Sequence, residues 1–179
     1  MADAEGAIRP ADKQDLEAVL ETLNITNKAF FEAIVTADVF RDPYLAVDEL
    51  EREFERKAFT VCEVQGRIVG VAAFEARRLG IGVVDRVYVL PGFQRKGIGA
   101  ALLAHIEGCA KAQGIREIVL WTDPKAVWAI AFYKRLGYSD IEPDAYYDDP
   151  MIDERVRQHG TELAVLRKAL FVDRMAEPL

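Results

Sequence analysis

The chain has 179 residues, a length at which a single domain can bury a substantial core. Hydrophobic residues make up 51% and charged residues 30% of it, which is typical of a soluble globular protein. The net charge of −7 argues against broad binding to nucleic acid. No apolar run approaches the roughly 20 residues that a membrane-spanning helix needs.

Targeting and cysteine signals favour a cytoplasmic protein. The first residues, Met-Ala-Asp-Ala-Glu, lack the basic and apolar regions of a secretory signal peptide. Cys62 and Cys109 are isolated in the sequence, so neither metal-ligand nor redox spacing is present. We therefore expect free thiols in a reducing cytoplasm and no bound metal. The sequence leaves open whether the protein is a monomer or a homodimer.

The first third of the chain predicts one strand and several helices. After a loose terminus at residues 1–6, residues 7–10 form a short strand. Asp12 is a suitable N-cap for the helix that follows, because its carboxylate can accept a bond from a first-turn N–H. Two further helical patterns cover residues 30–37 and 47–57.

The rest of the chain alternates strands with helices. Strands at 59–64 and 68–76 are joined by Gln65-Gly66-Arg67, which predicts a hairpin. The later elements are a strand at 81–89, a helix at 97–113, a strand at 118–121, a helix at 126–136 capped by Gly137, an extended stretch from Tyr138 and a strand at 162–170. This order mixes hairpins with a helical crossover and predicts one α+β domain over residues 7–173, followed by a tail at 174–179.

Residues 94–100, Gln94-Arg95-Lys96-Gly97-Ile98-Gly99-Ala100, carry the strongest chemical signal. They connect the expected strand at 81–89 to the expected helix at 97–113. Glycine lets a backbone approach an anion closely, and the free N–H groups and dipole of a helix start attract negative charge. Further arginines, Arg77, Arg78 and Arg86, lie nearby in sequence. The segment therefore predicts a cradle for a pyrophosphate.

Two common pyrophosphate sites do not fit this segment. A P-loop needs G-x-x-x-x-G-K-[ST], a string that the chain lacks. A dinucleotide fingerprint needs G-x-G-x-x-G, and here Gly97-Ile98-Gly99 continues without the third glycine. That fold also needs an acidic residue at the end of the next strand, whereas Glu117 begins it.

What remains is Gln/Arg-x-x-Gly-x-Gly/Ala, which resembles the acetyl-coenzyme A loop of the GNAT superfamily of N-acyltransferases. The preceding stretch, Val87-Tyr88-Val89-Leu90-Pro91-Gly92-Phe93-Gln94, resembles that family's fourth strand running into its loop. A second signature, A-x-x-F-Y-x-x-x-G-[FY], is matched by Ala129-Ile130-Ala131-Phe132-Tyr133-Lys134-Arg135-Leu136-Gly137-Tyr138. The two signatures are correctly ordered and spaced, and they cover about the middle third of the chain.

The resemblance implies a central mixed, mostly antiparallel sheet with helices on both faces. Its fourth and fifth strands would splay apart, and the arm of the cofactor would lie in the gap. The implied activity is direct transfer of an acetyl group from acetyl-CoA to a primary amine. A non-catalytic sensor of acyl-CoA is the alternative. One departure is Ala126, where the family commonly carries an asparagine that contacts the pantetheine arm.

The resemblance also implies roles for individual residues. The cofactor site would comprise Val87, Tyr88, Val89, Gln94, Arg95, Lys96, Gly97, Ile98, Gly99 and Ala100. Within it, the backbone N–H of Val87 would stabilise the carbonyl oxyanion, and Val89 would pair with the pantetheine amides. Tyr133 would protonate the leaving thiolate. Asp85 would act as the general base, although it could instead form a salt bridge, and an amine deprotonated by solvent would need no strong base.

The acceptor is predicted from charge alone. The segment from Asp140 to Glu154 is rich in acidic residues and has no Lys or Arg. It follows the signature that carries Tyr133, so we expect it to attract an amine with more than one positive charge, with Asp148 and Asp149 as contacts. A solvated loop is the alternative, and the sequence leaves open whether the acceptor is a small molecule or a protein.

Overall fold

The computed structural model describes residues 6–38, 40–77, 80–141 and 163–171. Its strands are β1 (Ala7–Pro10), β2 (Ala58–Val64), β3 (Arg67–Ala76), β4 (Ile81–Val89), β5 (Glu117–Thr122), β6 (Ser139–Asp140) and β7 (Ala164–Ala169). They form one sheet in the order β1-β2-β3-β4-β5-β7-β6. Among these strands every neighbouring pair is antiparallel except β4 and β5, which are parallel. The predicted mixed, mostly antiparallel sheet is confirmed.

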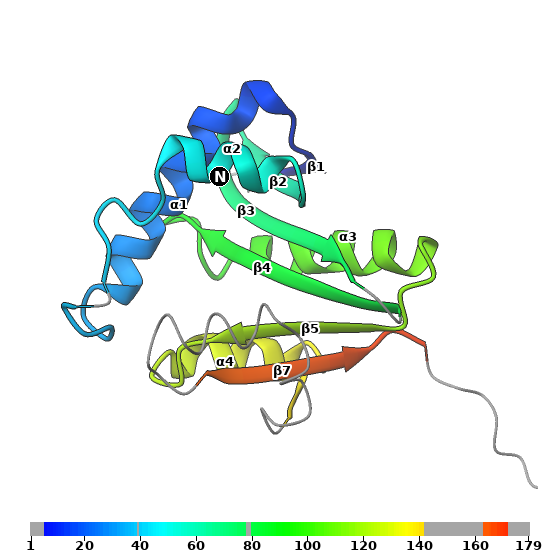
Figure 1. The fold of residues 1–179 in the computed structure, drawn as a ribbon. Coiled ribbons are helices and arrows are strands. Elements are labelled where there is room, and N and C mark those ends of the chain that lie inside the picture. The colour runs from blue at the N-terminus through cyan, green and yellow to red at the C-terminus, as the bar shows by residue number, and fades with distance from the viewer. Residues whose placement is uncertain (1–5, 39, 78–79, 142–162, 172–179) are drawn as a thin grey trace, which may run out of the picture.

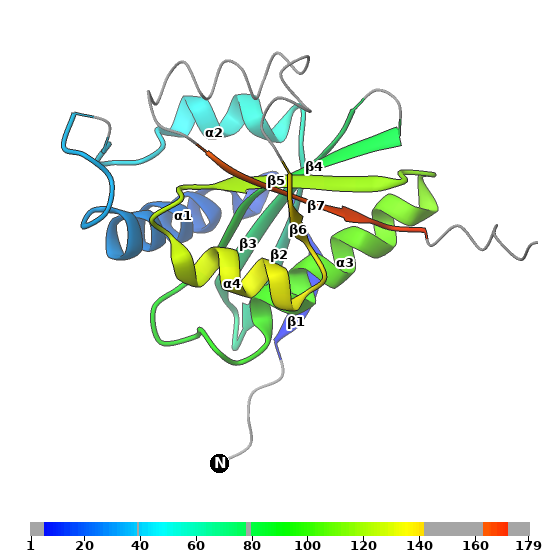
Figure 2. The same cartoon turned by 90° about the horizontal axis from the view of Figure 1, so that it is seen from below.

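Helices cover both faces of this sheet (Figures 1 and 2). They are the 3-10 turn η1 (Lys13–Asp15) and the helices α1 (Leu16–Phe31), α2 (Val47–Phe54), α3 (Ile98–Ala112) and α4 (Val127–Arg135). One core cluster packs α1 and α2 against the sheet through Leu23 and Leu50. The other packs α3 and α4 through Leu102 and Tyr133. These two apolar layers account for the α+β arrangement.

The predicted N-cap at Asp12 is confirmed, whereas the separate helix predicted at residues 30–37 is wrong. Asp12 accepts a bond from the Gln14 N–H at 2.7 Å, as an N-cap should. Only Phe30 and Phe31 of the apolar pattern at 30–37 are helical, and they form the end of α1. The β-branched run Ile34-Val35-Thr36 then disfavours helix, and the chain continues in turns.

The parallel pairing between β4 and β5 is short, and it leaves part of β4 without a neighbour on that side. Their register joins Ile81 to Glu117, Gly82 to Ile118 and Val83 to Val119. Beyond these pairs the two strands diverge, which Figure 1 shows on its left side. Residues 84–89 of β4 therefore keep β3 on one edge and leave the other edge to a cleft.

A bulge bends β4 at the same point. The β3–β4 register shifts between Val71 and Ala73, and Arg86 has a φ of 58°, in the left-handed region that non-glycine residues rarely adopt. Strained residues of this kind persist where the surrounding structure holds them, and they are frequent at functional sites.

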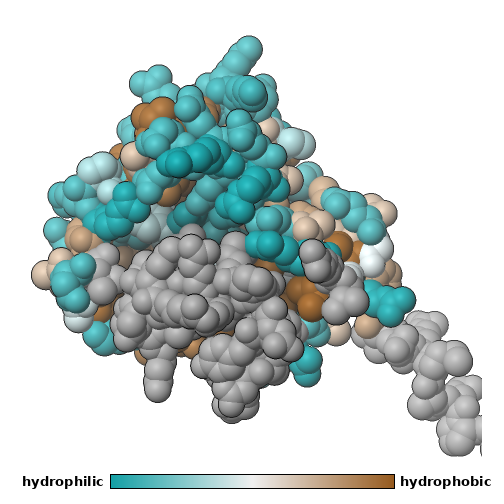
Figure 3. Space-filling model, in the orientation of Figure 1, coloured by the Kyte–Doolittle hydropathy of each residue, from teal (hydrophilic) through white to brown (hydrophobic). Residues whose placement is uncertain are grey.

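Two absences hold for the described part of the chain. None of its helices is long and apolar enough to cross a membrane. Nor do its His, Cys, Asp and Glu side chains gather into a group suited to a metal ion. Hydrophilic residues dominate the surface over α1 and α2 in the view of Figure 3.

Candidate active site

A cleft of about 680 Å³ opens where β4 and β5 diverge. Its walls come from residues 84–89 of β4, the loop before α3 with the first turn of that helix, both halves of α4, the end of α1 and parts of the segments 34–44 and 121–125. The cleft brings together the predicted residues Asp85, Val87, Tyr88, Val89, Gln94, Arg95, Gly97, Ile98, Gly99, Ala100 and Tyr133. Lys96 is absent from this lining, and its ammonium lies 5.4 Å from the centroid of the Phe93 ring. Asp148 and Asp149 lie outside the described residues.

At one end of the cleft, the loop before α3 has the backbone of an anion site. Arg95 and Gly97 are both left-handed, with φ of 60° and 83°. Gly97 is the N-cap of α3, so the N–H groups of the first turn after it have no partner within the helix. The Gln94 side chain donates to the carbonyl of Val89 at 3.1 Å and ties the loop to the end of β4. These features fit a pyrophosphate held by backbone N–H groups.

The two glycines of this loop serve different purposes. A Cβ on Gly97 would meet nothing within 4 Å, so what requires glycine at this position within the chain is its left-handed backbone conformation. A Cβ on Gly99 would lie 3.1 Å from Cζ of Phe132. Gly99 therefore allows α3 to pack closely on α4, the helix that carries Tyr133.

Few of the nearby arginines reach this end of the cleft. Arg77 pairs with Glu75 at 3.2 Å, and Arg86 pairs with Glu53 at 2.5 Å. Arg95 lines the cleft, and so does Arg135 from the last turn of α4. Arg135 is a cofactor-site candidate that the sequence reasoning missed, although it lies within the second signature.

Tyr133 lies in α4 with only 7% of its surface exposed and lines the cleft. Burial raises the pKa of its phenol well above the ordinary value, and the nearby Tyr88 and Asp85 raise it further. The hydroxyl therefore stays protonated at neutral pH, as a proton donor must. The ring is held between Phe132 at 5.2 Å and Tyr138 at 6.0 Å between centroids.

Asp85 lies in the cleft near Tyr133 but also belongs to a buried ionic network. Its Oδ2 is 2.9 Å from Nζ of Lys57, and its Oδ1 accepts the backbone N–H of Arg86 at 2.8 Å. Lys57 also pairs with Glu53 at 3.1 Å. The side chains of Lys57 and Arg86 are 2% and 3% exposed, so the four charges largely compensate one another away from water.

The network extends to the segment before α2, where Tyr44 lies. Arg86 donates to the Tyr44 hydroxyl, and its guanidinium carbon lies 4.9 Å from the centroid of the Tyr44 ring. Sequence reasoning missed Glu53, Lys57 and Tyr44. The only available signal was the position of Glu53 on the buried side of α2, which a charged residue seldom takes without a partner.

Ala126 is fully buried at the N-terminus of α4 and does not line the cleft. The side chain that would contact pantetheine is therefore missing there. Asp123 accepts the Lys125 N–H at 2.7 Å and shapes the turn, and both residues line the cleft beside Thr122. These polar groups are the nearest candidates to replace the missing amide.

The other end of the cleft is aromatic. The ring of Tyr88 lies 6.1 Å from that of Tyr44 and 5.9 Å from that of Phe31, and Phe31 lies 6.3 Å from Trp128 between centroids. All four residues line the cleft. Asn27 donates to the Tyr88 hydroxyl at 3.2 Å. We call Tyr44, Tyr88, Phe31 and Trp128 the aromatic wall.

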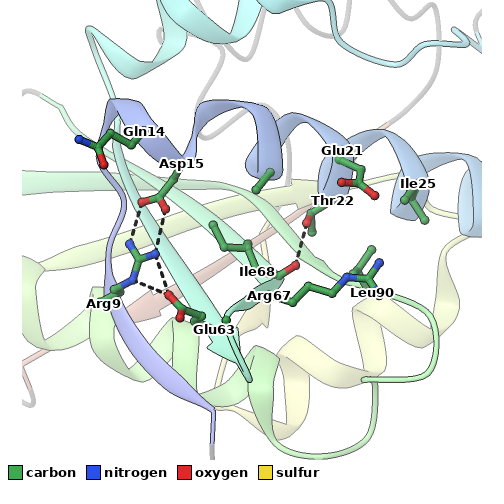
Figure 4. Close-up of a pocket in the computed structure, with 12 residues that line it drawn as sticks. Arg9, Gln14, Asp15, Glu21, Thr22, Ile25, Glu63, Arg67, Ile68 and Leu90 are labelled. Carbon is green, nitrogen blue, oxygen red and sulfur yellow. Dashed lines mark hydrogen bonds and ion pairs between the residues drawn. The ribbon is translucent and has the colours of Figure 1, made fainter.

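A second hollow, of about 220 Å³, lies between α1 and the β2–β3 hairpin (Figure 4). Its charged groups bind one another, because Arg9 contacts Asp15 at 2.7 Å and Glu63 at 2.8 Å. Thr22 donates to the carbonyl of Ile68 at 3.1 Å. These contacts fasten β1 and α1 to the sheet, and we assign them a structural role.

Comparison with known proteins decides the family. Residues 20–138, which include both signatures and the loop 94–100, match the model of the acetyltransferase (GNAT) family. The chain belongs to this family. The family resemblance inferred from the two signatures is therefore confirmed, and with it the assignment to the acyltransferases.

A curated relative agrees with this membership, and a solved structure agrees with the fold. The chain is 32% identical over 145 residues to the phosphinothricin N-acetyltransferase of Streptomyces viridochromogenes, covering 74% of this chain and 73% of that protein. An uncharacterized N-acetyltransferase of Methanocaldococcus jannaschii is 34% identical over 94 residues, and the match spans 49% of this chain and only 42% of that relative. The fold is similar to that of the PaiA N-acetyltransferase of Thermoplasma acidophilum, solved with coenzyme A, with a TM-score of 0.74, 19% identity and coverage of 94% and 99%.

Proposed function

We propose that this protein is an N-acetyltransferase that moves an acetyl group from acetyl-CoA directly to a primary amine. The observation that carries the proposal is one cleft in which the open edge of β4, the N-terminus of α3 and the buried Tyr133 meet. Each of these features supplies a group that acyl transfer from a thioester needs.

Acetyl-CoA fits the two parts of this cleft by its chemistry. Its pyrophosphate suits the first-turn N–H groups of α3 and the Arg95 side chain. Its pantetheine arm carries amides, which can pair with the free edge of β4 at Val87 and Val89 as an added strand would. Tyr88, Ile98 and Ala100 complete the lining around the arm.

The transfer would proceed by attack of the neutral amine nitrogen on the thioester carbonyl. The Val87 N–H would stabilise the negative charge that develops on the carbonyl oxygen. The carbon–sulfur bond then breaks, and the Tyr133 hydroxyl protonates the sulfur to give free CoA. The attacking nitrogen gives up one proton to water or a base, which leaves the N-acetyl product. A proton returned from water or from that base then restores the Tyr133 phenol.

The base stays a prediction. Asp85 lies near Tyr133, as a base in this cleft should, but its oxygens already contact Lys57 and the Arg86 N–H. If Asp85 is the base, its carboxylate would accept the proton of the amine while still in contact with Lys57 and the Arg86 N–H. Deprotonation of the amine by solvent is the second route, and a rate that follows only the amine's own pKa in Asp85→Asn would favour it.

The charge of the acceptor also stays a prediction. The acidic residues of the segment 140–154 support attraction of a cationic amine, and Asp148 and Asp149 are the proposed contacts. Attraction between exposed charges is screened over about 10 Å at 0.1 M salt, so KM should rise with salt. In the double variant Asp148→Asn with Asp149→Asn, KM for a diamine should rise more than KM for a monoamine.

A non-catalytic acyl-CoA sensor is the second candidate, because Ala126 removes a polar contact that the family commonly makes. Turnover separates the two. Release of free thiol from acetyl-CoA, measured with a panel of primary amines and matched by the mass of an acetylated product, supports the enzyme. Calorimetric binding of CoA without acetylation of any amine in the panel supports the sensor. We expect the reaction to occur in the cytoplasm.

A further inference from the structure

The aromatic wall adjoins the centre where the acetyl group would be transferred. Tyr88 follows Val87 directly on β4, and Tyr88 lies near enough to Tyr133 to affect the pKa of its phenol. From Tyr88 the wall continues to Phe31 at the end of α1 and to Trp128 in α4. An amine placed for attack at the thioester would therefore have its own substituent against these rings.

The rings offer a fixed and partly exposed apolar surface. The hydroxyl of Tyr88 accepts from Asn27, and that of Tyr44 accepts from Arg86, which holds both rings in position. Trp128 is 44% exposed although it is a large aromatic residue. A surface that stays partly open to water, with two of its four rings held by hydrogen bonds, is suited to an apolar ligand.

The charges around the wall disfavour a second cation there. Arg41, Arg86 and Lys125 line the cleft, where Arg41 is paired with Glu49 and Arg86 with Glu53. The ring of Tyr44 is already covered by the Arg86 guanidinium at 4.9 Å, so a further ammonium would meet a like charge on that ring. Two carboxylates line the cleft among the described residues: Asp85 is in contact with Lys57, and Asp123 accepts the Lys125 N–H.

We propose that the acceptor is a small monoamine whose body is aromatic, joined to the primary amine by a short saturated linker. The body packs on Phe31, Tyr88 and Trp128, and the amine nitrogen reaches the thioester beside Val87. This inference rests on the proposed N-acetyltransferase function and names its substrate class. This substrate class differs from the multiply charged acceptor predicted from the segment 140–154, and the amine panel below decides between them.

A panel of three amines tests the substrate class with the full-length chain and acetyl-CoA. 2-Phenylethylamine carries the aromatic body, ethylamine lacks it, and 1,4-diaminobutane replaces it with a second charge. We expect kcat/KM for 2-phenylethylamine to exceed the other two values by about tenfold or more, the discrimination that an apolar group in a pocket provides. An equal or greater kcat/KM for 1,4-diaminobutane, or for ethylamine, overturns the proposal.

Variants of the wall test the position of the body. Phe31→Ala and Trp128→Ala should lower kcat/KM for 2-phenylethylamine several-fold more than for ethylamine. Phe171→Ala is the matched control, because Phe171 is 51% exposed and lies outside the cleft. It should leave the ratio of the two values unchanged. Equal losses for both amines in the wall variants would contradict the assigned position.

The failure of this inference can be told apart from failure of the enzyme proposal. Acetylation of amines without any preference for the aromatic one overturns the inference and leaves the enzyme proposal standing. If no amine is acetylated, the enzyme proposal fails. The wall is then judged by calorimetric titration of 2-phenylethylamine and 1,4-diaminobutane into the CoA complex, where tighter binding of the diamine, or no binding of 2-phenylethylamine, overturns it.

Discussion

Replacement of Tyr133 by phenylalanine removes the proposed proton donor and little else. The ring would keep its contacts with Phe132 at 5.2 Å and Tyr138 at 6.0 Å, and the loss of one hydroxyl opens no large cavity. We therefore expect a folded variant that binds CoA with unchanged affinity. Its kcat should fall by about 10²-fold or more, or ~2.7 kcal/mol in the barrier, which is what one general acid contributes.

The pH dependence of the unmodified enzyme also tests Tyr133 as the proton donor. Burial raises the pKa of Tyr133, so the donor is protonated throughout the neutral and mildly alkaline range. The rate should therefore rise with pH as the amine loses its proton, without a fall near pH 7 to 9 from this tyrosine. Tyr133→Phe should lower this profile without changing its shape over the range.

The assay must isolate the chemical step. Single-turnover acetylation with enzyme in excess over acetyl-CoA measures it without product release. Tyr138→Phe is the matched control, because the Tyr138 hydroxyl is buried against Glu107 at 3.1 Å and lies outside the cleft lining. A single-turnover rate of Tyr133→Phe within about twofold of the parent would refute the role of Tyr133 as proton donor.

Three further changes have expected outcomes. Gly97→Val should weaken CoA binding at least about tenfold in calorimetry, because a side chain would stand where the pyrophosphate is proposed to approach. Gly92→Val is the control, because Gly92 is also left-handed and in open space but lies outside the cleft lining. Equal CoA affinity in the two variants would contradict the proposed pyrophosphate site. Lys57→Met should lower the free energy of unfolding in urea by about 3–5 kcal/mol, because Glu53 and Asp85 would lose a neighbouring positive charge. Lys28→Met, which removes an exposed ion pair, should lower it by less than about 1 kcal/mol. Stability should fall above about pH 10, because Tyr138 has a raised pKa when folded and the unfolded chain ionises first; thermal melts that are flat to pH 11 would contradict this.

Local signals predicted the fold well where one residue type dictates the backbone. Gln65 and Gly66, both left-handed, form the turn between β2 and β3, as their sequence suggested. Gly137, also left-handed, ends α4, with the Tyr138 N–H bonded to the Tyr133 carbonyl at 3.1 Å. The separate helix at 30–37 was wrong, since apolar periodicity alone cannot tell the end of one helix from the start of another.

The cleft was predictable where its residues belong to the two sequence signatures or to the strand before them. The loop 94–100 and the strand 81–89 could be predicted from their glycines and apolar pattern, because the proposed contacts there are backbone N–H groups, whose positions the motif fixes. Side chains that meet across the fold leave no such pattern. Lys57 and Asp85 are 28 positions apart, and neither position indicates the other.

At the Arg86 bulge, a local strand motif depends on side chains that come from distant parts of the sequence. Its left-handed backbone is strained by about 1–3 kcal/mol. The neighbouring sequence contains no signal that predicts this conformation at an arginine. Glu53 and Tyr44 take up the side chain and hold this conformation from α2 and the segment before it. The next residue is Val87, whose N–H is the proposed oxyanion donor. The geometry of that donor therefore depends on charges that come from a helix more than 30 positions earlier, which a motif confined to β4 cannot encode.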